Sequence, residues 1–345
     1  MAKFYDISTW NERPYFQTLG TRNKVIVENP DDHSEYYFKT SLKREMKDYK
    51  HEFWSEIVAS EVGELLGFDM LQYDIAFNRG EIGCLSKSMV TMGKNTLNEG
   101  IKYLTGYDTT YDPEDKSSKK QYTFQLICDT LKYYQVGHYI DKIIEIIILD
   151  SLIGNSDRHQ ENWGILTEYQ DVIKVLEEIA SKEKKGLSET LFSLFGITSK
   201  SKMESKSKQI KELRLKMPGQ FSQIYDSGSC LGREIEDEKM TKMMSDDLMI
   251  NAYINRGNSE IHWDGEKISH FELIKNVNNS YPEAVKRIIN SVKQKYHENQ
   301  IKDCIYNIDK ELPNELKHHE LPVERKDFIF KLIDLRAQKL ITLIG

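Results

Sequence analysis

The sequence predicts a bilobal α+β fold, with a β-rich N-terminal lobe over residues 1–90 and a mainly helical C-terminal lobe over residues 91–345. Short runs of β-branched and aromatic residues, bounded by turn residues, dominate the first part, and this pattern is typical of strands. Apolar residues at helical spacing dominate the second part. With 345 residues, of which 39% are hydrophobic, the chain is long enough to form two cores.

The first predicted element is a β-hairpin. Residues 25–27 and 35–39 are strand-like runs joined by an Asn-Pro-Asp-Asp turn, and the second run ends in Lys39. Residues 18–24, just before the hairpin, are small, polar and basic, with one glycine, Gly20. Such a stretch could bind phosphate groups through backbone N–H groups, and a plain surface turn is an equal alternative.

A helix and two more strands complete the predicted N-terminal lobe. Residues 51–66 are expected to form an amphipathic helix, because apolar residues recur along one helical face. That face carries Trp54, Val58, Val62 and Leu65. Most glutamates of this helix are expected to be solvated, and one of them could face a lysine. Strands are predicted at residues 72–77 and 83–90, on either side of a turn at residues 78–81.

The C-terminal lobe is predicted to be mainly helical after a polar loop at residues 107–121. Residues 140–153 are apolar nearly all round, which predicts a buried central helix. Residues 167–220 are highly charged, and we predict an insertion there, with helices at residues 171–185, 187–195 and 199–216. The last of these is basic and could bind an acidic partner or nucleic acid, although a solvated face is the commoner role. Further helices are expected at residues 236–246, 282–297 and 324–344.

Polar residues crowd into the chain directly after the predicted central helix, at residues 155–164. Asp157 is followed five positions later by Asn162. Phosphoryl-transfer enzymes of the protein-kinase type use this spacing, with the Asp orienting the attacking hydroxyl group and the Asn holding Mg²⁺. The sequence therefore indicates a catalytic loop.

The other groups that phosphoryl transfer needs occur in a suitable order along the chain. The reaction needs a cation near the phosphates, a carboxylate for Mg²⁺, a second metal ligand and a base that orients the acceptor. The candidates in chain order are Lys39, Glu56, Asp157, Asn162 and Asp226. A strand lysine or an Asp-x-Gly turn is weak evidence alone. The indication therefore rests on the ordered set.

Other chemistry for this loop has less support. His159 could be a zinc ligand or a general base, but no His or Cys lies at ligand spacing, so we expect it to brace the loop. Ser151 and Ser156 lack the G-x-S-x-G context of an acyl-transfer nucleophile. The four cysteines form no C-x-x-C pair, which argues against a zinc site or a disulfide framework and favours a reducing compartment.

Charge and hydropathy narrow the function classes further. The net charge is −7, so we expect no direct binding to nucleic acid or to a membrane surface. The N-terminus lacks the apolar core of a secretory signal, and the longest apolar cluster, residues 143–153, is too short to span a bilayer. The cytoplasm is the expected location, with export through a specialised secretion system as the alternative.

Residues 155–164 and 224–231 resemble the catalytic and metal-binding segments of HipA-like serine/threonine kinases, most closely those of the small CtkA-type branch. The resemblance extends to residues 37–39, 53–59 and 250–255 and so covers most of the chain. It implies a protein-kinase-like fold in which ATP binds between the two lobes. Residues 84–89 would then form the hinge whose backbone meets adenine.

The resemblance also implies a role for each residue of the ordered set. Lys39 would contact the α- and β-phosphates, and Glu56 would orient Lys39. Asp157 would be the base, and Asn162 and Asp226 would hold Mg²⁺. Further nucleotide-binding candidates are Thr18, Gly20, Thr21 and Lys24 in the phosphate-side loop and Leu85, Ser86 and Lys87 in the hinge. Some members of the family phosphorylate themselves in that loop, so Thr18 or Thr21 is a candidate autophosphorylation site.

Three features depart from the family pattern. A glycine-rich G-x-G-x-x-G loop is absent. A long stretch separates Asn162 from Asp226, so the insertion at residues 167–220 is expected to regulate access or to dock a substrate, an antitoxin or a regulator. The large N-terminal subdomain of full-length HipA toxins has no counterpart in the sequence, so binding of a HipB-like antitoxin in the same way does not follow.

The resulting prediction is an ATP- and Mg²⁺-dependent serine/threonine protein kinase that phosphorylates a protein substrate and itself. The same groups would serve any hydroxyl acceptor, so a phosphotransferase acting on a small molecule or a lipid is the first alternative. A non-catalytic module that binds ATP or docks a partner is the second.

Overall fold

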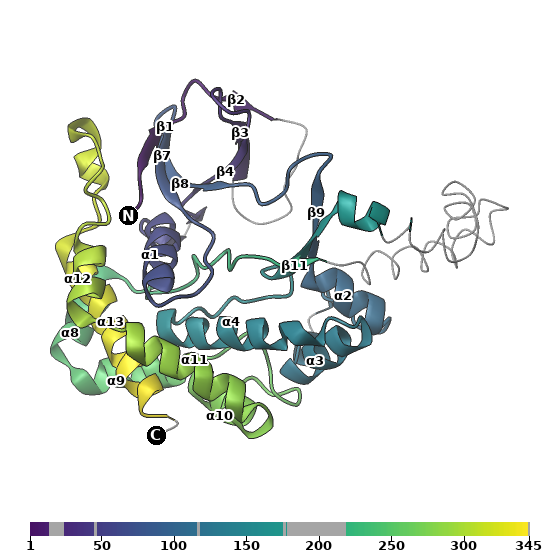
Figure 1. The fold of residues 1–345 in the computed structure, drawn as a ribbon. Coiled ribbons are helices and arrows are strands. Elements are labelled where there is room, and N and C mark those ends of the chain that lie inside the picture. The colour runs from purple at the N-terminus through teal and green to yellow at the C-terminus, as the bar shows by residue number, and fades with distance from the viewer. Residues whose placement is uncertain (14–23, 45–46, 116–117, 175–176, 178–218, 344–345) are drawn as a thin grey trace. The chain divides into compact units, whose positions relative to one another are not determined.

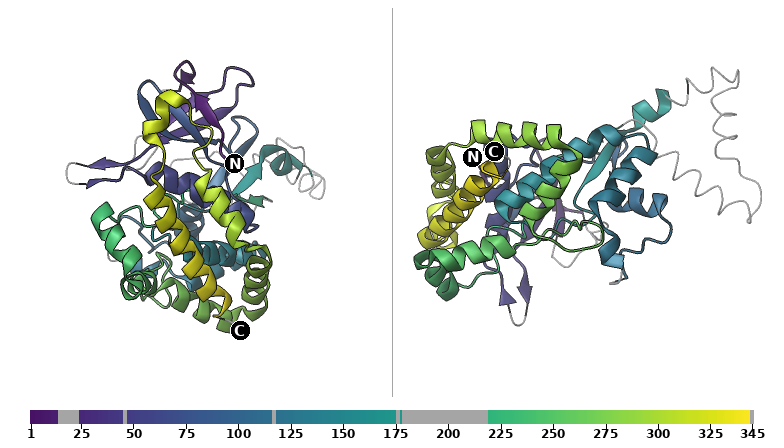
Figure 2. Two further views of the ribbon diagram at one scale, coloured as in Figure 1. Left: turned by 90° about the vertical axis from the view of Figure 1, so that its left-hand side faces the viewer. Right: turned by 90° about the horizontal axis from the view of Figure 1, so that it is seen from below.

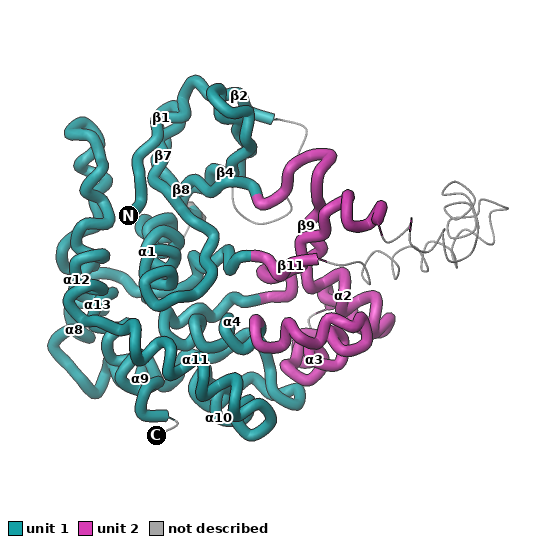
Figure 3. Tube along the Cα trace, viewed as in Figure 1, with its two compact units in different colours: residues 1–88, 143–158, 223–345 teal, residues 89–142, 159–222 magenta. Residues whose placement is uncertain are grey.

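The computed structural model describes residues 1–13, 24–44, 47–115, 118–174, 177 and 219–343. The chain divides into two compact units (Figure 3). Unit 1 comprises residues 1–88, 143–158 and 223–345, and unit 2 comprises residues 89–142 and 159–222. The lobe boundary at residue 90 and the limits of the insertion stay predictions.

Unit 1 begins with a curled six-stranded sheet of order β1-β7-β8-β4-β3-β2 (Figure 1). Strand β1 pairs in parallel with β7, and the other neighbours are antiparallel. The strands are β1 (Phe4–Asp6), β2 (Asn11–Glu12), β3 (Lys24–Glu28), β4 (Glu35–Thr40), β7 (Asp74–Asn78) and β8 (Glu81–Lys87). A separate two-stranded ribbon consists of β5 (Lys43–Arg44) and β6 (Lys47–Asp48).

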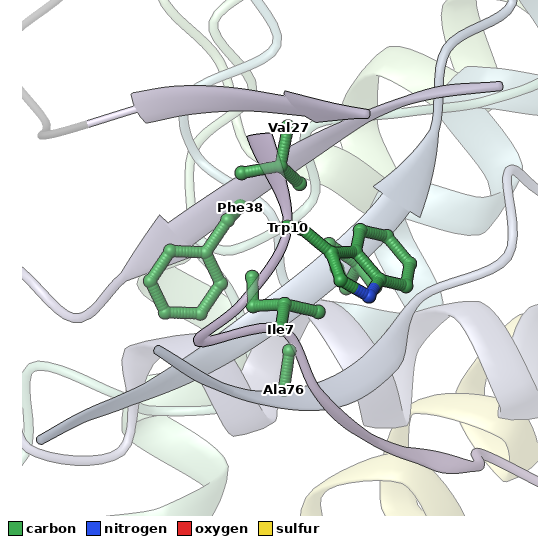
Figure 4. Packing of buried hydrophobic residues seen from close by; sticks show 6 residues of the cluster. Ile7, Trp10, Val27, Phe38 and Ala76 are labelled. Carbon is green, nitrogen blue, oxygen red and sulfur yellow. The ribbon is translucent and has the colours of Figure 1, made fainter. Parts of the chain in front are cut away.

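One face of this sheet carries an apolar core (Figure 4). The core consists of Ile7, Trp10, Val27, Phe38, Ala76 and Leu85. Because successive side chains of a strand point to opposite faces, Lys39 lies on the other face from Phe38. Helix α1 (Glu52–Leu65) contacts β4 and β8. The ion pair between Lys39 and Glu56 places α1 on the Lys39 face.

The rest of unit 1 is helical. Helix α13 (Val323–Ile341) packs against other helices of this unit (Figure 2). These are α8 (Asp237–Ser245), α9 (Asp247–Arg256), α11 (Pro282–Lys295) and α12 (Glu298–Tyr306). Helix α10 (His270–Ser280) packs on α11, and a 3₁₀ helix, η3 (Asn314–His319), precedes α13. The buried side chains of α11 recur at helical spacing, which explains how one polar helix joins this layer.

Unit 2 contains a three-stranded antiparallel sheet of order β11-β10-β9 and several helices. The strands are β9 (Asn95–Glu99), β10 (Gly164–Glu168) and β11 (Gln220–Phe221). The helices are α2 (Gly100–Tyr107), η1 (Ser118–Gln121), α3 (Phe124–Tyr133) and η2 (Gly137–Tyr139). A Cβ atom at Gly100 would lie 2.2 Å from the buried Trp163 ring, so only glycine allows this close packing.

Helix α4 (Ile140–Ile153) begins in unit 2 and continues into unit 1, with the bounds that the sequence predicted. The hairpin of β3 and β4, helix α1 and helices α8, α11 and α13 are also confirmed within a few residues. The expected helices at residues 187–195 and 199–216 lie outside the described residues, as does most of the one at residues 171–185. Every described helix is too short or too polar to span a bilayer.

Candidate active site

Lys39, near the end of β4, is the centre of an ion-pair cluster in unit 1. Its Nζ lies 3.5 Å from Oε1 of Glu56 and 3.2 Å from Oδ1 of Asp226. Burial opposes the charge of this lysine, but the carboxylates of Asp226 and Glu56 outweigh it, so the pKa of Lys39 is raised well above its ordinary value. The structure therefore brings together three of the five residues of the ordered set, with Lys39 as a cation.

The glutamates of α1 correct one sequence-based expectation. Glu52, Glu56 and Glu61 are buried, although most glutamates of this helix were predicted to be solvated, and Glu64 alone of the four is exposed. Each buried one has a specific partner. Glu56 binds Lys39 and accepts a hydrogen bond from the Ser227 N–H at 2.8 Å, and the chain's N-terminal amine lies 3.1 Å from Glu61. Helical spacing alone does not reveal such partners, because they come from distant parts of the chain.

Asp226 has an unusual backbone conformation that its surroundings hold in place. Its φ angle is +55°, in the left-handed region, which Asp and Asn enter more readily than other non-glycine residues. Its N–H donates a hydrogen bond to the Tyr73 hydroxyl at 3.1 Å. The carboxylate lies between Lys39 and Lys24, whose Nζ is 3.7 Å from Oδ2. Burial raises the pKa of Tyr73, so its phenol stays neutral. Sequence reasoning missed Tyr73.

A buried pair between Arg158 and Asp150 connects the predicted catalytic loop to the Asp226 segment. The guanidinium group donates to both carboxylate oxygens of Asp150, at 2.9 and 3.0 Å. It also donates to the Ser227 hydroxyl at 3.0 Å and to the Tyr225 carbonyl. Since Tyr225 and Ser227 flank Asp226, Arg158 fixes the segment that carries this carboxylate. Sequence reasoning missed both partners, although an acid at the end of an apolar helix needs a buried cation.

Asp157 lies in the same loop and is exposed. Its N–H donates to Oδ1 of Asn155 at 3.2 Å, and Asn155 in turn donates to Asp150 at 3.0 Å. Its Oδ2 accepts a hydrogen bond from the Ser229 hydroxyl at 3.2 Å. The loop therefore presents the Asp157 carboxylate to solvent while its backbone is held by buried groups, which suits a base that must meet an acceptor hydroxyl.

The remaining loop residues belong to unit 2. Asn162 is buried, and its N–H donates to the His159 carbonyl at 2.9 Å. Nδ1 of His159 accepts a hydrogen bond from the Glu161 N–H at 3.3 Å. These contacts close a turn over residues 159–162 and agree with a bracing role for His159.

The structure describes only part of the predicted nucleotide-binding segments. Thr18, Gly20 and Thr21 lie outside the described residues, whereas Lys24 reaches Asp226. In the predicted hinge, Leu85 packs in the apolar core, Ser86 is buried opposite Tyr37, and Lys87 is exposed beside Asp32. By strand alternation Ser86 lies on the face of Lys39, and Leu85 lies on the other. The hinge and the phosphate-side loop stay predictions.

The acidic groups suit a metal that the substrate helps to hold. Among the described residues, no three His, Cys, Asp or Glu side chains form a group that could bind a metal ion by themselves. Mg²⁺ in phosphoryl-transfer sites is typically held by one or two protein side chains together with phosphate oxygens and water. Asp226, a partly exposed carboxylate in this cluster, fits such a ligand.

No protein-family model matches the sequence, and no curated protein sequence matches it. Solved structures do resemble the chain, and two of them are described here. The proinflammatory kinase CtkA of Helicobacter pylori matches with a TM-score of 0.68 and 19% identity, over 98% of this chain and 96% of that one. The fold is that of the HipA-like kinases. The predicted fold class and the resemblance at the level of the fold are confirmed.

The second structure is HipA of Shewanella oneidensis MR-1, solved in a complex of the toxin–antitoxin system with HipB and operator DNA. It matches with a TM-score of 0.52 and 10% identity, over 97% of this chain and 67% of that one. The HipA-like fold thus extends over nearly the whole chain in both cases. At these identities the likeness concerns the fold alone.

Proposed function

We propose that this protein is an ATP- and Mg²⁺-dependent serine/threonine protein kinase that also phosphorylates itself. The observation that carries the proposal is the ion-pair cluster of Lys39, Glu56 and Asp226, connected through Arg158 to the loop that presents Asp157. This arrangement sits on a HipA-like kinase fold. Catalysis of phosphoryl transfer consists mainly of positioning and charge neutralisation, and these residues supply both.

The proposal assigns a role to each residue. Lys39 neutralises phosphate charge, and Glu56 orients Lys39 from the buried side. Asp226 and Asn162 would hold Mg²⁺, which supplies charge neutralisation at the β- and γ-phosphates. The exposed carboxylate of Asp157 orients the acceptor hydroxyl and accepts its proton. Lys24 and the predicted loop at residues 18–24 would add contacts to the phosphates, and backbone groups near Leu85, Ser86 and Lys87 would meet adenine.

Incubation of the purified protein with labelled ATP and Mg²⁺ tests the proposal. We expect label on the protein itself and on a generic basic protein substrate, and loss of label when EDTA removes the metal. Asp157→Asn should lower the transfer rate by about 10²- to 10⁴-fold while the protein stays folded. Asp264→Asn, which changes another exposed loop aspartate, is the matched control and should keep full activity.

Mass spectrometry of the labelled protein tests the finer parts of the proposal. Phosphate on serine or threonine supports the predicted acceptor class, and phosphate on Thr18 or Thr21 supports autophosphorylation in the phosphate-side loop. Absence of label on any protein, together with absence of ATP binding in calorimetry, would contradict the proposal.

Two alternatives give different results in the same assays. A phosphotransferase for a small molecule or a lipid would consume ATP without labelling protein. A non-catalytic binding module would bind ATP without turnover, or would bind a partner through the insertion at residues 167–220. The charged cluster at Lys39 favours catalysis, because a docking module has no need for a buried lysine between two carboxylates.

A further inference from the structure

Helix α1 carries two buried glutamates one turn apart, Glu52 and Glu56. Side chains at positions i and i+4 of a helix lie on the same face, so both point toward the same part of unit 1. Glu56 serves the Lys39 cluster. Glu52 has no part in the proposed chemistry, yet it is 1% exposed, and burial of a carboxylate is costly without specific partners.

The partners of Glu52 lead to the catalytic loop. One oxygen forms an ion pair with Arg233, and the other accepts a hydrogen bond from the Leu42 N–H at 2.9 Å. The Arg233 guanidinium group stacks over the Tyr49 ring, 4.7 Å from its centroid, and Nη2 donates to the Ser229 hydroxyl at 2.9 Å. Ser229 then donates to Oδ2 of Asp157 at 3.2 Å.

The order of donors and acceptors fixes the direction of this series of hydrogen bonds. A guanidinium group can only donate, so the Ser229 oxygen acts as acceptor toward Arg233. The single proton of the hydroxyl is then available for the carboxylate of Asp157. Arg233 therefore fixes the rotor of Ser229, and Ser229 holds one oxygen of Asp157.

Backbone hydrogen bonds also join residues 229–231 to the loop that carries Asp157. The Ser156 N–H donates to the Ser229 carbonyl at 3.4 Å, and the Leu231 N–H donates to the Ile153 carbonyl at 2.9 Å. Residues 229–231 therefore run beside the chain that carries Asp157. A shift of Ser229 would move the loop as well as the hydrogen bond to its carboxylate.

We propose that Glu52, Arg233 and Ser229 position the catalytic carboxylate of Asp157, so that α1 holds the active site at two points. Glu56 holds the Lys39 end, and Glu52 holds the Asp157 end. None of the three touches a reacting atom, so they are positioning residues. This inference rests on the proposed function, because it assigns Asp157 a catalytic role.

A double-mutant cycle in the kinase assay tests whether Arg233 acts on Asp157 through Ser229. Ser229→Ala and Arg233→Met should each lower kcat about tenfold, and the double variant should be no slower than the slower single variant, because both break the same path. Affinity for ATP should stay within about twofold of the parent, because the Lys39 cluster is untouched. Arg233→Lys keeps a donor for Ser229 and should recover part of the lost kcat.

Lys326→Met is the matched control. Lys326 forms a buried ion pair with Asp309 at 2.7 Å, within the C-terminal helices. Its removal should lower the melting temperature and leave kcat unchanged. The proposal is overturned if the effects of Ser229→Ala and Arg233→Met multiply, or if these variants lose stability with kcat intact, as the control does.

Hydrogen exchange separates this inference from the proposed function. If the parent protein transfers no phosphate, the proposed function fails, and the positioning chain is then tested by exchange of the Ser156 and Leu231 amides. Arg233→Met should speed exchange at both amides, and Lys326→Met should not. If Arg233→Met does not fold, Ser229→Ala, which removes one oxygen atom, gives the same measurement. Unchanged exchange in these variants overturns the proposal.

Discussion

Two ion-pair groups in unit 1 differ in burial and in the length of their contacts. The difference separates a group that stabilises the fold from the group at the candidate active site. The Arg158 pair, formed by Arg158 and Asp150, has side chains 1% and 4% exposed and hydrogen bonds of 2.9 to 3.0 Å along its best-formed contacts. The Lys39 cluster consists of Lys39, Glu56 and Asp226, and Lys24 also reaches Asp226. The ion pairs of these four residues span 3.2 to 3.7 Å. The Asp226 side chain is 18% exposed.

The difference indicates what each group does. The buried guanidinium group donates in fixed directions to Asp150, Tyr225 and Ser227, and a charge buried in this way is stable only if it is fully paired. In the Lys39 cluster, the ammonium groups of Lys39 and Lys24 lie at longer range from the Asp226 carboxylate, which is partly exposed. The proposed function requires phosphate groups to replace part of these contacts, whereas the contacts of Arg158 are expected to stay in place. Four changes test this distinction.

The largest effect is expected from breaking the Arg158 pair. Arg158→Met should lower the free energy of unfolding by about 3–5 kcal/mol, because it leaves Asp150 as an unpaired buried charge. Urea denaturation followed by circular dichroism measures this loss. Removing both charges with Asp150→Leu and Arg158→Met should cost less than the single change at Arg158. An equal or larger cost in the double variant would contradict the assignment as a buried ion pair.

The next effect concerns activity rather than stability. Lys39→Met should lower the transfer rate by about 10²- to 10³-fold, which is typical for the loss of one charge-stabilising donor. Its free energy of unfolding should fall by less than that of Arg158→Met, because Asp226 is partly exposed and keeps Lys24, and because the buried Glu56 keeps its hydrogen bond from the Ser227 N–H. Initial rates with labelled ATP and urea denaturation give the two numbers. A larger loss of stability in Lys39→Met than in Arg158→Met would contradict the view that the Arg158 pair stabilises the fold more than the Lys39 cluster does.

A third buried cation extends the comparison. Arg336 is buried and donates to the Ser151 carbonyl at 3.1 Å. Burial, the nearby Arg336 charge and Lys267 together lower the pKa of His270 to about 3, and within the described chain neither ring nitrogen of His270 has a hydrogen-bond partner. His270 is therefore neutral in the folded protein and must stay so beside Arg336.

The sign of the pH effect follows from that lowered pKa. The unfolded chain binds a proton at His270 below about pH 6.5 and the folded chain does not, so stability is fully present above that pH and is lost as the pH falls. The loss between pH 7 and pH 5 should be about 2 kcal/mol. His270→Leu should remove this part of the slope in denaturation curves at the two pH values. An unchanged slope would show that other groups cause the acid sensitivity.

The smallest effect is expected at Lys24. Its Nζ lies 3.7 Å from Asp226, and the two side chains are 20% and 18% exposed. Lys24→Met should change the free energy of unfolding by less than about 1 kcal/mol, and the difference should fade at high salt. KM for ATP should rise if Lys24 contacts phosphate. A loss of stability that persists at high salt would show instead that Lys24 stabilises the fold, as Arg158 does.

The order of residues along the chain was enough to place Lys39, Glu56 and Asp226 in one set of candidates, but it did not predict what holds them together. Lys39, Glu56 and Asp226 match the order of groups that a phosphoryl-transfer enzyme has along its chain, so each candidate supports the others. Asp150, Arg158 and Tyr73 act through tertiary contacts that have no fixed spacing. One signal was present, because an aspartate on a helix that is apolar all round requires a partner. The burial of the α1 glutamates was not predicted for the same reason, because their partners also have no fixed spacing along the chain.

The strands that were missed have a different cause. Strands β1 and β2 span only Phe4–Asp6 and Asn11–Glu12, too short to show an alternating pattern. Strand β9 has the sequence Asn-Thr-Leu-Asn-Glu, in which the hydrogen-bonded amides of Asn95 and Asn98 are buried. A polar strand of this kind resembles a loop in sequence, and only its pairing with β10 defines it.

The left-handed backbone at Asp226 also bears on how much protein a cell retains when this position mutates. Asparagine and glycine adopt a φ angle of +55° easily, so Asp226→Asn or Asp226→Gly should leave the polypeptide abundant but inactive. β-Branched residues such as valine strain the same backbone and should lower the steady-state amount through degradation of unfolded chains. Substitutions that inactivate the protein at this position should therefore form two classes. One class is inactive but well expressed, and the other accumulates poorly.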